Sequence, residues 1–309
     1  EGIVYFRFRT ALFGMEQYWF GVLDHDGVPR RRYYEIQKTG AELMKLKDYI
    51  IGTENKYEAL IVKTYDNVWS HEIKRHTARY DYRSLLYAYY KANAALNINT
   101  AVSAGDYEKY RVVYMPSYNI VEDDEIDRVK KYVQNGGVLV LTFRSGTRDT
   151  YNNMLPMAVP GVFGDLAGIE VEEFDALRRE VKVCGAVSGT AKIWCDIIKP
   201  VTAETLCLYD GEYYKGRAAV TVNRYGKGKV YYVGCDLDHA AMVKLVELIS
   251  KDAGISPVYA PAGVEIVKRE GYTILLNHNE YEVSLPIKGR SLMSGKDFDG
   301  RLEGYGVEF

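Results

Sequence analysis

Apolar residues gather along this chain in short uninterrupted runs, with helical patterns between them. The clearest run occupies residues 138–142 and follows a glycine pair at 136–137. A run without a polar face predicts a strand buried on both sides, as in the middle of a parallel sheet covered by helices. Residues 58–65 form another run of this kind, so we expect a second buried strand there.

Amphipathic helices are predicted between these runs. Apolar side chains recur at helical spacing over residues 82–90 and again over 126–133. The second helix begins with acidic residues at 122–124, where the helix dipole favours negative charge. Shorter apolar runs at 99–103 and 111–115 predict two more strands. Strands that alternate with helices in this way predict a parallel α/β sheet joined by right-handed crossovers.

The first fifty residues follow another pattern. Residues 2–9 alternate well enough to predict a strand, an aromatic-rich loop follows, and a helix is predicted from Arg31 to Ile50, with Gly52 ending it. This is a single β-loop-α unit. Because one such unit cannot make a sheet, we expect it to complete a fold begun by preceding residues or to pack on the next domain.

The second half of the chain predicts mostly antiparallel structure. A loop and a short helix are expected over 156–168, and a last helix over 242–249 ending at Gly254. A linker at 259–263 precedes a small antiparallel β module of about fifty residues. The predicted strands of this half lie at 181–183, 192–194, 205–209, 218–223, 229–234, 264–268, 272–277 and 282–287.

Length and charge narrow the function classes. A chain of 309 residues suggests two domains plus a fragment. A net charge of −2 without a basic cluster argues against nucleic acid as a partner. No apolar run approaches the roughly 20 residues of a membrane span, so we expect a soluble cytoplasmic protein. A strand-like pattern begins almost at Glu1, which favours a piece of a longer protein.

Cofactor and metal signals are weak. The four cysteines at 184, 195, 207 and 235 have no zinc-knuckle spacing and are expected to be buried free thiols. No glycine-rich phosphate motif follows a predicted strand, so we expect no cofactor. The segment at 225–228 is better explained as a turn between strands. The segment at 235–239 has metal-ligand residue types, but an acidic helix start explains it better.

A nucleophile is the first candidate for chemistry. Ser145 follows the buried strand at 138–142, where α/β hydrolases and amidotransferases carry one, but the residue two before it is Phe143 rather than the glycine of a Gly-x-Ser-x-Gly turn. A base among three histidines and an orienting carboxylate among three aspartates stay possible. Those residues are His71, His76, His239, Asp149, Asp236 and Asp238.

A sugar-binding loop is the other candidate. Glu16 lies among Phe13, Tyr18 and Trp19 directly after the predicted first strand. Aromatic rings stack on the apolar face of a pyranose, and a carboxylate holds a hydroxyl by a charge-assisted hydrogen bond. The structural alternative is that these aromatic side chains pack between two domains, with Glu16 in an ion pair. The residue types alone favour neither.

Four groups of motifs occur in a fixed order along nearly the whole chain. They are Phe6-Arg7-Phe8-Arg9 with Phe13-Gly14-Met15-Glu16-Gln17, then residues 141–149, then Pro160-Gly161 with residues 168–175, and finally residues 271–278.

These motifs resemble family 42 of the glycoside hydrolases, the β-galactosidases. The first is similar to the eighth strand and following loop of that family's (β/α)8 barrel. The middle two are similar to its trimerisation domain, a flavodoxin-like fold related to class I glutamine amidotransferases but without their nucleophile. The last resembles its small C-terminal β domain. The resemblance implies three domains: the last barrel βα unit at 1–54, an α/β trimerisation domain with a mostly parallel sheet at 55–257, and an antiparallel β domain at 258–309.

The resemblance also implies a function. Family members cleave terminal β-D-galactosides by a retaining double displacement with two glutamates, both on barrel strands that would precede Glu1. Glu16 matches a glutamate that binds galactose, and Trp19 stands where histidine is common, so the contacts with the sugar are expected to differ there. We therefore expect a homotrimer that supplies part of a sugar pocket, through Phe13, Glu16 and Trp19, and that is inactive alone. The rival functions are an amidotransferase-like enzyme using Ser145 and a stand-alone carbohydrate-binding protein.

Overall fold

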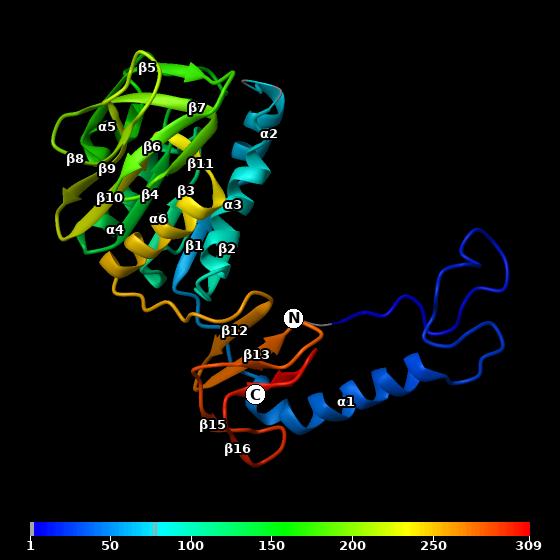
Figure 1. Ribbon diagram of the computed structural model, residues 1–309. Coiled ribbons are helices and arrows are strands. Elements are labelled where there is room, and N and C mark those ends of the chain that lie inside the picture. Colours follow the sequence, from blue (N-terminus) through cyan, green and yellow to red (C-terminus); the bar gives the residue numbers. More distant parts are fainter. Residues whose placement is uncertain (1–2, 76, 78) are drawn as a thin grey trace.

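The computed structural model describes residues 3–75, 77 and 79–309, and one large sheet dominates it (Figure 1). Within these residues the sheet has eleven strands. One half is parallel, in the order β2-β1-β3-β4-β10. Every residue of β1, β3 and β4 is buried, which confirms the strands predicted from uninterrupted apolar runs. These strands are β1 (Ala59–Val62), β2 (Thr100–Ser103), β3 (Val112–Met115), β4 (Val138–Thr142) and β10 (Gly228–Val233).

The other half of the sheet is antiparallel. The hairpin β9-β10 joins the two halves through the predicted turn at 225–228, where Gly226 has φ +60° and a Cβ would lie 2.7 Å from the Gln134 backbone. This half extends the α/β core with long twisted strands. Its members are β5 (Ile169–Ala176), β6 (Val181–Gly185), β7 (Gly189–Pro200), β8 (Glu204–Tyr209), β9 (Ala218–Tyr225) and β11 (Cys235–Leu237).

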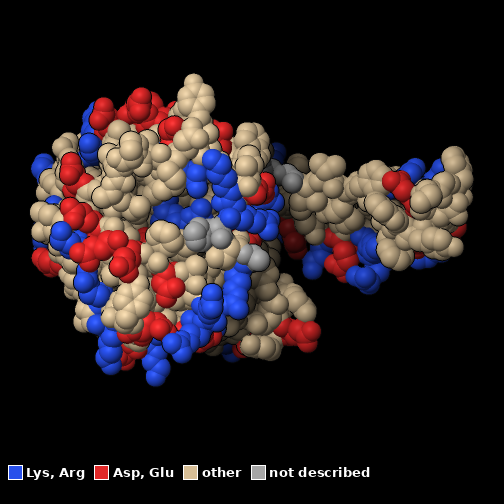
Figure 2. Space-filling model, turned by 90° about the horizontal axis from the view of Figure 1, so that it is seen from above, with Lys and Arg blue, Asp and Glu red and all other residues tan. Residues whose placement is uncertain are grey.

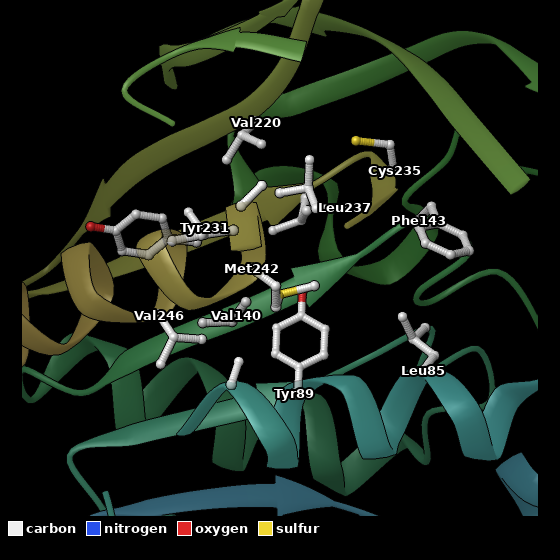
Figure 3. Packing of buried hydrophobic residues seen from close by; sticks show 14 of the residues in the cluster. Leu85, Tyr89, Val140, Phe143, Val220, Tyr231, Cys235, Leu237, Met242 and Val246 are labelled. Atoms are coloured by element: carbon white, nitrogen blue, oxygen red, sulfur yellow. The ribbon is translucent and has the colours of Figure 1, made fainter. Parts of the chain in front are cut away.

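Helices cover both faces of the parallel strands. On one face α3 (Tyr82–Ala94) packs against α6 (His239–Asp252), and Figure 3 shows Tyr89 of α3 pointing toward Met242 of α6 above Val140. On the other face α4 (Asp123–Gln134) lies with the short helix α5 (Gly164–Ala167). Because adjacent strand residues alternate between these two apolar clusters, the strands carry no polar face.

The helix α2 (Tyr65–Ile73) was not predicted. The run at 58–65 was expected to be one strand, but β1 ends at Val62. Thr64 begins the helix instead, because its hydroxyl oxygen accepts a hydrogen bond from the backbone N–H of Asn67 at 3.3 Å. The helix has nine residues and buries Val68, Ser70 and His71.

The predicted strand at 2–9 is wrong over residues 3–9, and Gly2 lies outside the described residues. Only an isolated parallel bridge joins Arg9 to Leu23. A strand requires a neighbour that pairs along its length, and among the described residues only the segment 21–23 pairs with it. The predicted helix at 31–50 is confirmed as α1 (Arg31–Ile50). Figure 1 shows α1 and the preceding segment reaching away from the α/β domain.

A small antiparallel β domain follows the α/β domain, as predicted. Its three-stranded sheet has the order β12-β13-β18 over the apolar cluster around Ile266 and Leu275. Arg269 joins it to the end of α1 by donating to the Thr53 hydroxyl at 3.1 Å. The remaining elements are η1 (Tyr107–Lys109), η2 (Gly161–Phe163), β12 (Val264–Arg269), β13 (Tyr272–Asn277), β14 (Val283–Ser284), β15 (Gly289–Arg290), β16 (Asp297–Phe298), β17 (Arg301–Leu302) and β18 (Val307–Glu308).

Among the described residues, no helix combines the length and the apolar character that crossing a membrane requires.

Candidate functional site

The aromatic loop of residues 11–20 is closed at its base by backbone hydrogen bonds. Val22 N–H donates to the Arg7 carbonyl at 2.8 Å, and Leu23 N–H donates to the Phe8 carbonyl at 2.7 Å. The buried Thr10 hydroxyl donates to the Leu23 carbonyl at 2.9 Å and accepts from Gly21 N–H at 3.0 Å. A Cβ on Gly21 would lie 2.6 Å from the Thr10 nitrogen, so this close approach requires glycine.

The three predicted sugar-binding residues lie on this one loop. Phe13 is 84% exposed and Trp19 is 61% exposed, whereas Glu16 is partly buried. Trp19 N–H donates to the Glu16 carbonyl at 3.2 Å, so the two residues share one turn. The Glu16 carboxylate lies 3.9 Å from the Arg7 guanidinium. This ion pair fits the structural alternative, but it leaves carboxylate and aromatic surface open to solvent, so a role in sugar binding remains a prediction.

A second set of charged residues ties the loop to the start of α1. Asp24 forms ion pairs with Arg30, at 3.0 Å, and with Arg32. The Arg30 guanidinium also bonds Asp26 and lowers the pKa of that carboxyl well below its usual range. The Arg32 guanidinium lies 5.3 Å from the Phe20 ring centroid. Sequence reasoning missed these contacts because the aspartates precede the helix in an irregular segment with no periodicity.

The serine candidate lies in a different place, after β4. Ser145 is completely buried, and its hydroxyl donates to the Met115 carbonyl at 3.4 Å. The Nε2 atom of His71 is 2.8 Å from the Ser117 carbonyl. Burial lowers the pKa of His71 to about 3, with Arg144 adding to the effect, so the ring is neutral near pH 7. Both side chains are thus held by backbone carbonyls, which disfavours a nucleophile and base pair.

The other members of the proposed triads also have structural partners. Asp149 accepts from the backbone N–H groups of residues 151 and 153. Asp236 accepts from the N–H groups of residues 192–194. Asp238 caps α6 through Ala241 N–H at 3.1 Å. His239 begins that helix, and His76 lies outside the described residues. The geometry therefore gives no support to the amidotransferase-like function.

The cysteines also have a structural place. Cys184, Cys195, Cys207 and Cys235 are free thiols, and burial is confirmed for all of them except Cys184, which is exposed, so the prediction of a buried thiol is wrong there. Burial raises the pKa of the Cys195 thiol to about 12. A thiol that stays protonated near pH 7 is a poor nucleophile and a poor metal ligand.

A group that sequence reasoning missed is Asp196 of β7. Its carboxylate is buried and accepts from the Trp194 indole N–H and from the Tyr232 hydroxyl, both at 2.7 Å. Burial raises the pKa of Asp196 to about 6 against the lowering effect of these donors. The sequence offered one signal, an acidic residue among apolar neighbours. That position lay outside the predicted strands, so the signal was not used.

Comparison with protein families gives three matches that follow one another along the chain. A model described as the beta-galactosidase trimerisation domain matches residues 58–256. A beta-galactosidase model matches residues 1–46, and a model of the beta-galactosidase C-terminal domain matches residues 263–308. The order is that expected from the sequence motifs.

Individual proteins show the same similarity. The chain is 30% identical to beta-galactosidase BgaA of Clostridium cellulovorans over 100% of its own length and 49% of that protein. It is 33% identical to BgaB of a Geobacillus species, covering 99% of this chain and 48% of the relative. The crystal structure of a beta-galactosidase from Bacillus circulans superposes with a TM-score of 0.93 at 29% identity, over 98% of this chain and 48% of that one. The chain thus spans about half the length of the relatives it matches.

Proposed function

Because the chain belongs to the glycoside hydrolase family 42 β-galactosidases, we propose that it is the C-terminal half of a retaining enzyme that cleaves terminal β-D-galactosides. In this proposal the two catalytic glutamates lie on barrel strands that precede these residues. The described residues contribute the wall of the sugar pocket that carries Glu16, the α/β domain and the small β domain. The three matched spans support a division at 1–54, 55–257 and 258–309.

The observation that carries the proposal is the exposed apolar surface of the N-terminal segment. Val4, Phe13, Met15 and Tyr18 are each more than four-fifths exposed. Soluble proteins rarely leave so much contiguous apolar surface in water, and such surface marks a contact that the segment makes elsewhere. We propose that the other strands of a barrel cover it, since barrel sites are built from the ends of several strands.

We propose that Glu16 accepts a hydrogen bond from a galactose hydroxyl and that Phe13 and Trp19 contact the apolar face of the ring. Charge-assisted hydrogen bonds are about twice as strong as neutral ones. Trp19 has only its indole N–H to donate, so in this role it acts mainly through its ring face.

The test uses the full-length protein that contains this chain. Glu16→Gln should lower kcat/KM on a β-galactoside about 10- to 100-fold, which corresponds to loss of a hydrogen bond to a charged group. Glu35→Gln is the matched control, because Glu35 is exposed on α1. If the Glu16 variant is as active as the Glu35 variant, Glu16 does not bind the sugar.

The α/β domain is proposed to be flavodoxin-like and to assemble three copies. The parallel order β2-β1-β3-β4-β10 matches the flavodoxin-like order 2-1-3-4-5. Trimer formation is supported by the matched trimerisation-domain model. Sedimentation of this chain should give three times its mass of 35.2 kDa, and a monomer at micromolar concentration would contradict the proposed trimer.

Because the cysteines are free thiols, we propose that the protein is located in a reducing compartment, the cytoplasm.

A further inference from the structure

A small cavity lies where the loop after β4 meets the antiparallel half of the sheet. Its volume is about 200 Å³. Arg144 and Arg148 come from that loop, Phe174 comes from β5, and Trp194 comes from β7. Val159, Val171 and Met154 complete an apolar wall. In parallel α/β sheets this edge, beyond the carboxyl ends of the strands, is where ligands bind.

Arg144 holds an unusual position in this cavity. Its backbone has φ +66°, in the left-handed region that residues other than glycine, asparagine and aspartate seldom adopt. Its guanidinium lies 4.9 Å from the Tyr80 ring centroid and 6.0 Å from that of Trp194. The Nη1 atom is buried and has no hydrogen-bond partner among the residues that the structure describes. A strained backbone that holds an unsatisfied buried donor is typical of a functional position.

The charges around Arg144 leave the cavity positive. Asp196 also lines the cavity, and its two oxygens accept from the Trp194 indole N–H and the Tyr232 hydroxyl, so its one negative charge stands against the two positive charges of Arg144 and Arg148. Among the described residues, Arg144 forms no ion pair with a carboxylate. Arg148 adds a second guanidinium, whose Nη1 donates to the Asn152 carbonyl at 2.9 Å. Figure 2 looks onto this end of the molecule and shows lysine and arginine side chains gathered there.

We propose that this cavity binds a small organic carboxylate, with the Arg144 guanidinium on the carboxylate and the rings of Phe174 and Trp194 against the apolar part of the ligand. A planar guanidinium matches the two oxygens of a carboxylate. The apolar wall favours a ligand with a hydrocarbon portion over a fully hydrated anion such as phosphate. This site goes beyond galactoside cleavage and requires no residue of the aromatic loop.

The carboxylate has two possible sources. It is either a free small molecule or the side chain of an aspartate or glutamate on a second copy of this chain. Both sources present the same carboxylate group to Arg144. The experiment therefore has one arm that measures binding and one arm that identifies the source of the carboxylate.

The binding arm titrates the chain with sodium benzoate and follows Trp194 fluorescence in a Trp19→Phe, Trp69→Phe background. Trp194 is buried and borders the cavity. We expect a saturable change, with phosphate binding at least tenfold more weakly and sodium chloride giving no saturation. Arg144→Asn suits the left-handed backbone, so the variant should fold, and it should weaken benzoate binding at least about tenfold. Arg148→Asn should weaken it about threefold or more.

Arg179→Asn is the matched control, because Arg179 is an exposed arginine of the same domain, paired with Glu212. Its benzoate affinity should equal that of the background protein. The proposal is overturned if benzoate gives no saturable change, if the Arg144 and Arg148 variants bind as the control does, or if phosphate binds as tightly as benzoate.

The source arm measures self-association by sedimentation, with and without benzoate. If a second copy supplies the carboxylate, benzoate and Arg144→Asn should both weaken self-association. If the ligand is a free molecule, neither should change it. Either result is consistent with the cavity as a carboxylate site and identifies where the carboxylate comes from.

Discussion

The N-terminal segment and the α/β domain use apolar residues in opposite ways. In the α/β domain every residue of β1, β3 and β4 is buried. In the N-terminal segment Val4 is 94% exposed and Met15 is 96% exposed. The two regions have comparable apolar content, so composition does not explain the difference. In the α/β domain the apolar side chains pack against one another, whereas in the N-terminal segment several of them contact solvent.

Polar groups differ between the two regions in the same way. In the α/β domain, buried carboxylates such as Asp196 and Glu125 have tyrosine hydroxyls as donors. In the N-terminal segment, the Glu16 carboxylate lies 3.9 Å from the Arg7 guanidinium, and both side chains are a little under half exposed. A buried polar group is stable only when its hydrogen-bond partner is fixed in place, and the α/β domain supplies such partners for these two carboxylates.

The largest effect expected from this comparison concerns two leucines. Leu139→Ala should lower the free energy of unfolding by about 2–5 kcal/mol, because the Leu139 side chain on β4 is fully buried in the apolar cluster under α4 and α5 and truncation leaves a cavity. Leu12→Ala should change it by less than about 0.5 kcal/mol, because Leu12 is 57% exposed. Urea denaturation measures both. Similar losses for the two variants would mean that the N-terminal segment is packed in solution.

A smaller effect concerns the buried carboxyl of Asp196. Its pKa is about 6 in the folded protein and about 3.9 unfolded, so the folded state binds the proton more tightly. The stability that this group contributes is present below pH 4 and is lost as the pH rises through 6. Relative to Asp196→Asn, the wild type should therefore lose about 2–3 kcal/mol between pH 4 and pH 8.

Urea denaturation of the two proteins at pH 4 and pH 8 gives this difference directly. The comparison with Asp196→Asn removes the contributions of all other titrating groups, including His71. A stability difference between wild type and variant that does not change with pH would show that Asp196 titrates near its ordinary value.

The smallest effect is expected at Glu16. Exposed ion pairs contribute about 0–1 kcal/mol, and the Arg7–Glu16 pair is 3.9 Å long with both side chains nearly half exposed. Glu16→Gln should therefore leave the free energy of unfolding within about 0.5 kcal/mol of wild type. A loss above about 1 kcal/mol would assign Glu16 a structural role in the loop and would weaken its assignment to sugar binding.

The helices and strands that could be predicted from the sequence are those that a local pattern of apolar residues determines. The strands β3 and β4 followed from uninterrupted apolar runs, and α3 followed from tyrosines and leucines at helical spacing. The helix α2 was missed because its nine residues alternate apolar, polar and charged side chains without a clear face. Its start depends on one threonine cap, which periodicity cannot detect.

Contacts between distant segments could not be predicted in the same way. The cavity at Arg144 joins a loop after β4 to a strand fifty residues later, and no local pattern links the two. The expected strand at 3–9 failed for a related reason, since its alternation indicates a strand only where a neighbour pairs with it. The sugar-binding prediction at Phe13, Glu16 and Trp19 came from the family resemblance and from residue types, and it awaits its test.

The most direct measurement is turnover of a β-galactoside by this chain, alone and after mixing with the separately produced N-terminal half of the same protein, with masses verified. Because a barrel site needs carboxylates from several strands, the chain alone should give no turnover above background, and the mixture should give turnover that Glu16→Gln reduces. Turnover well above background by the chain alone would contradict the account.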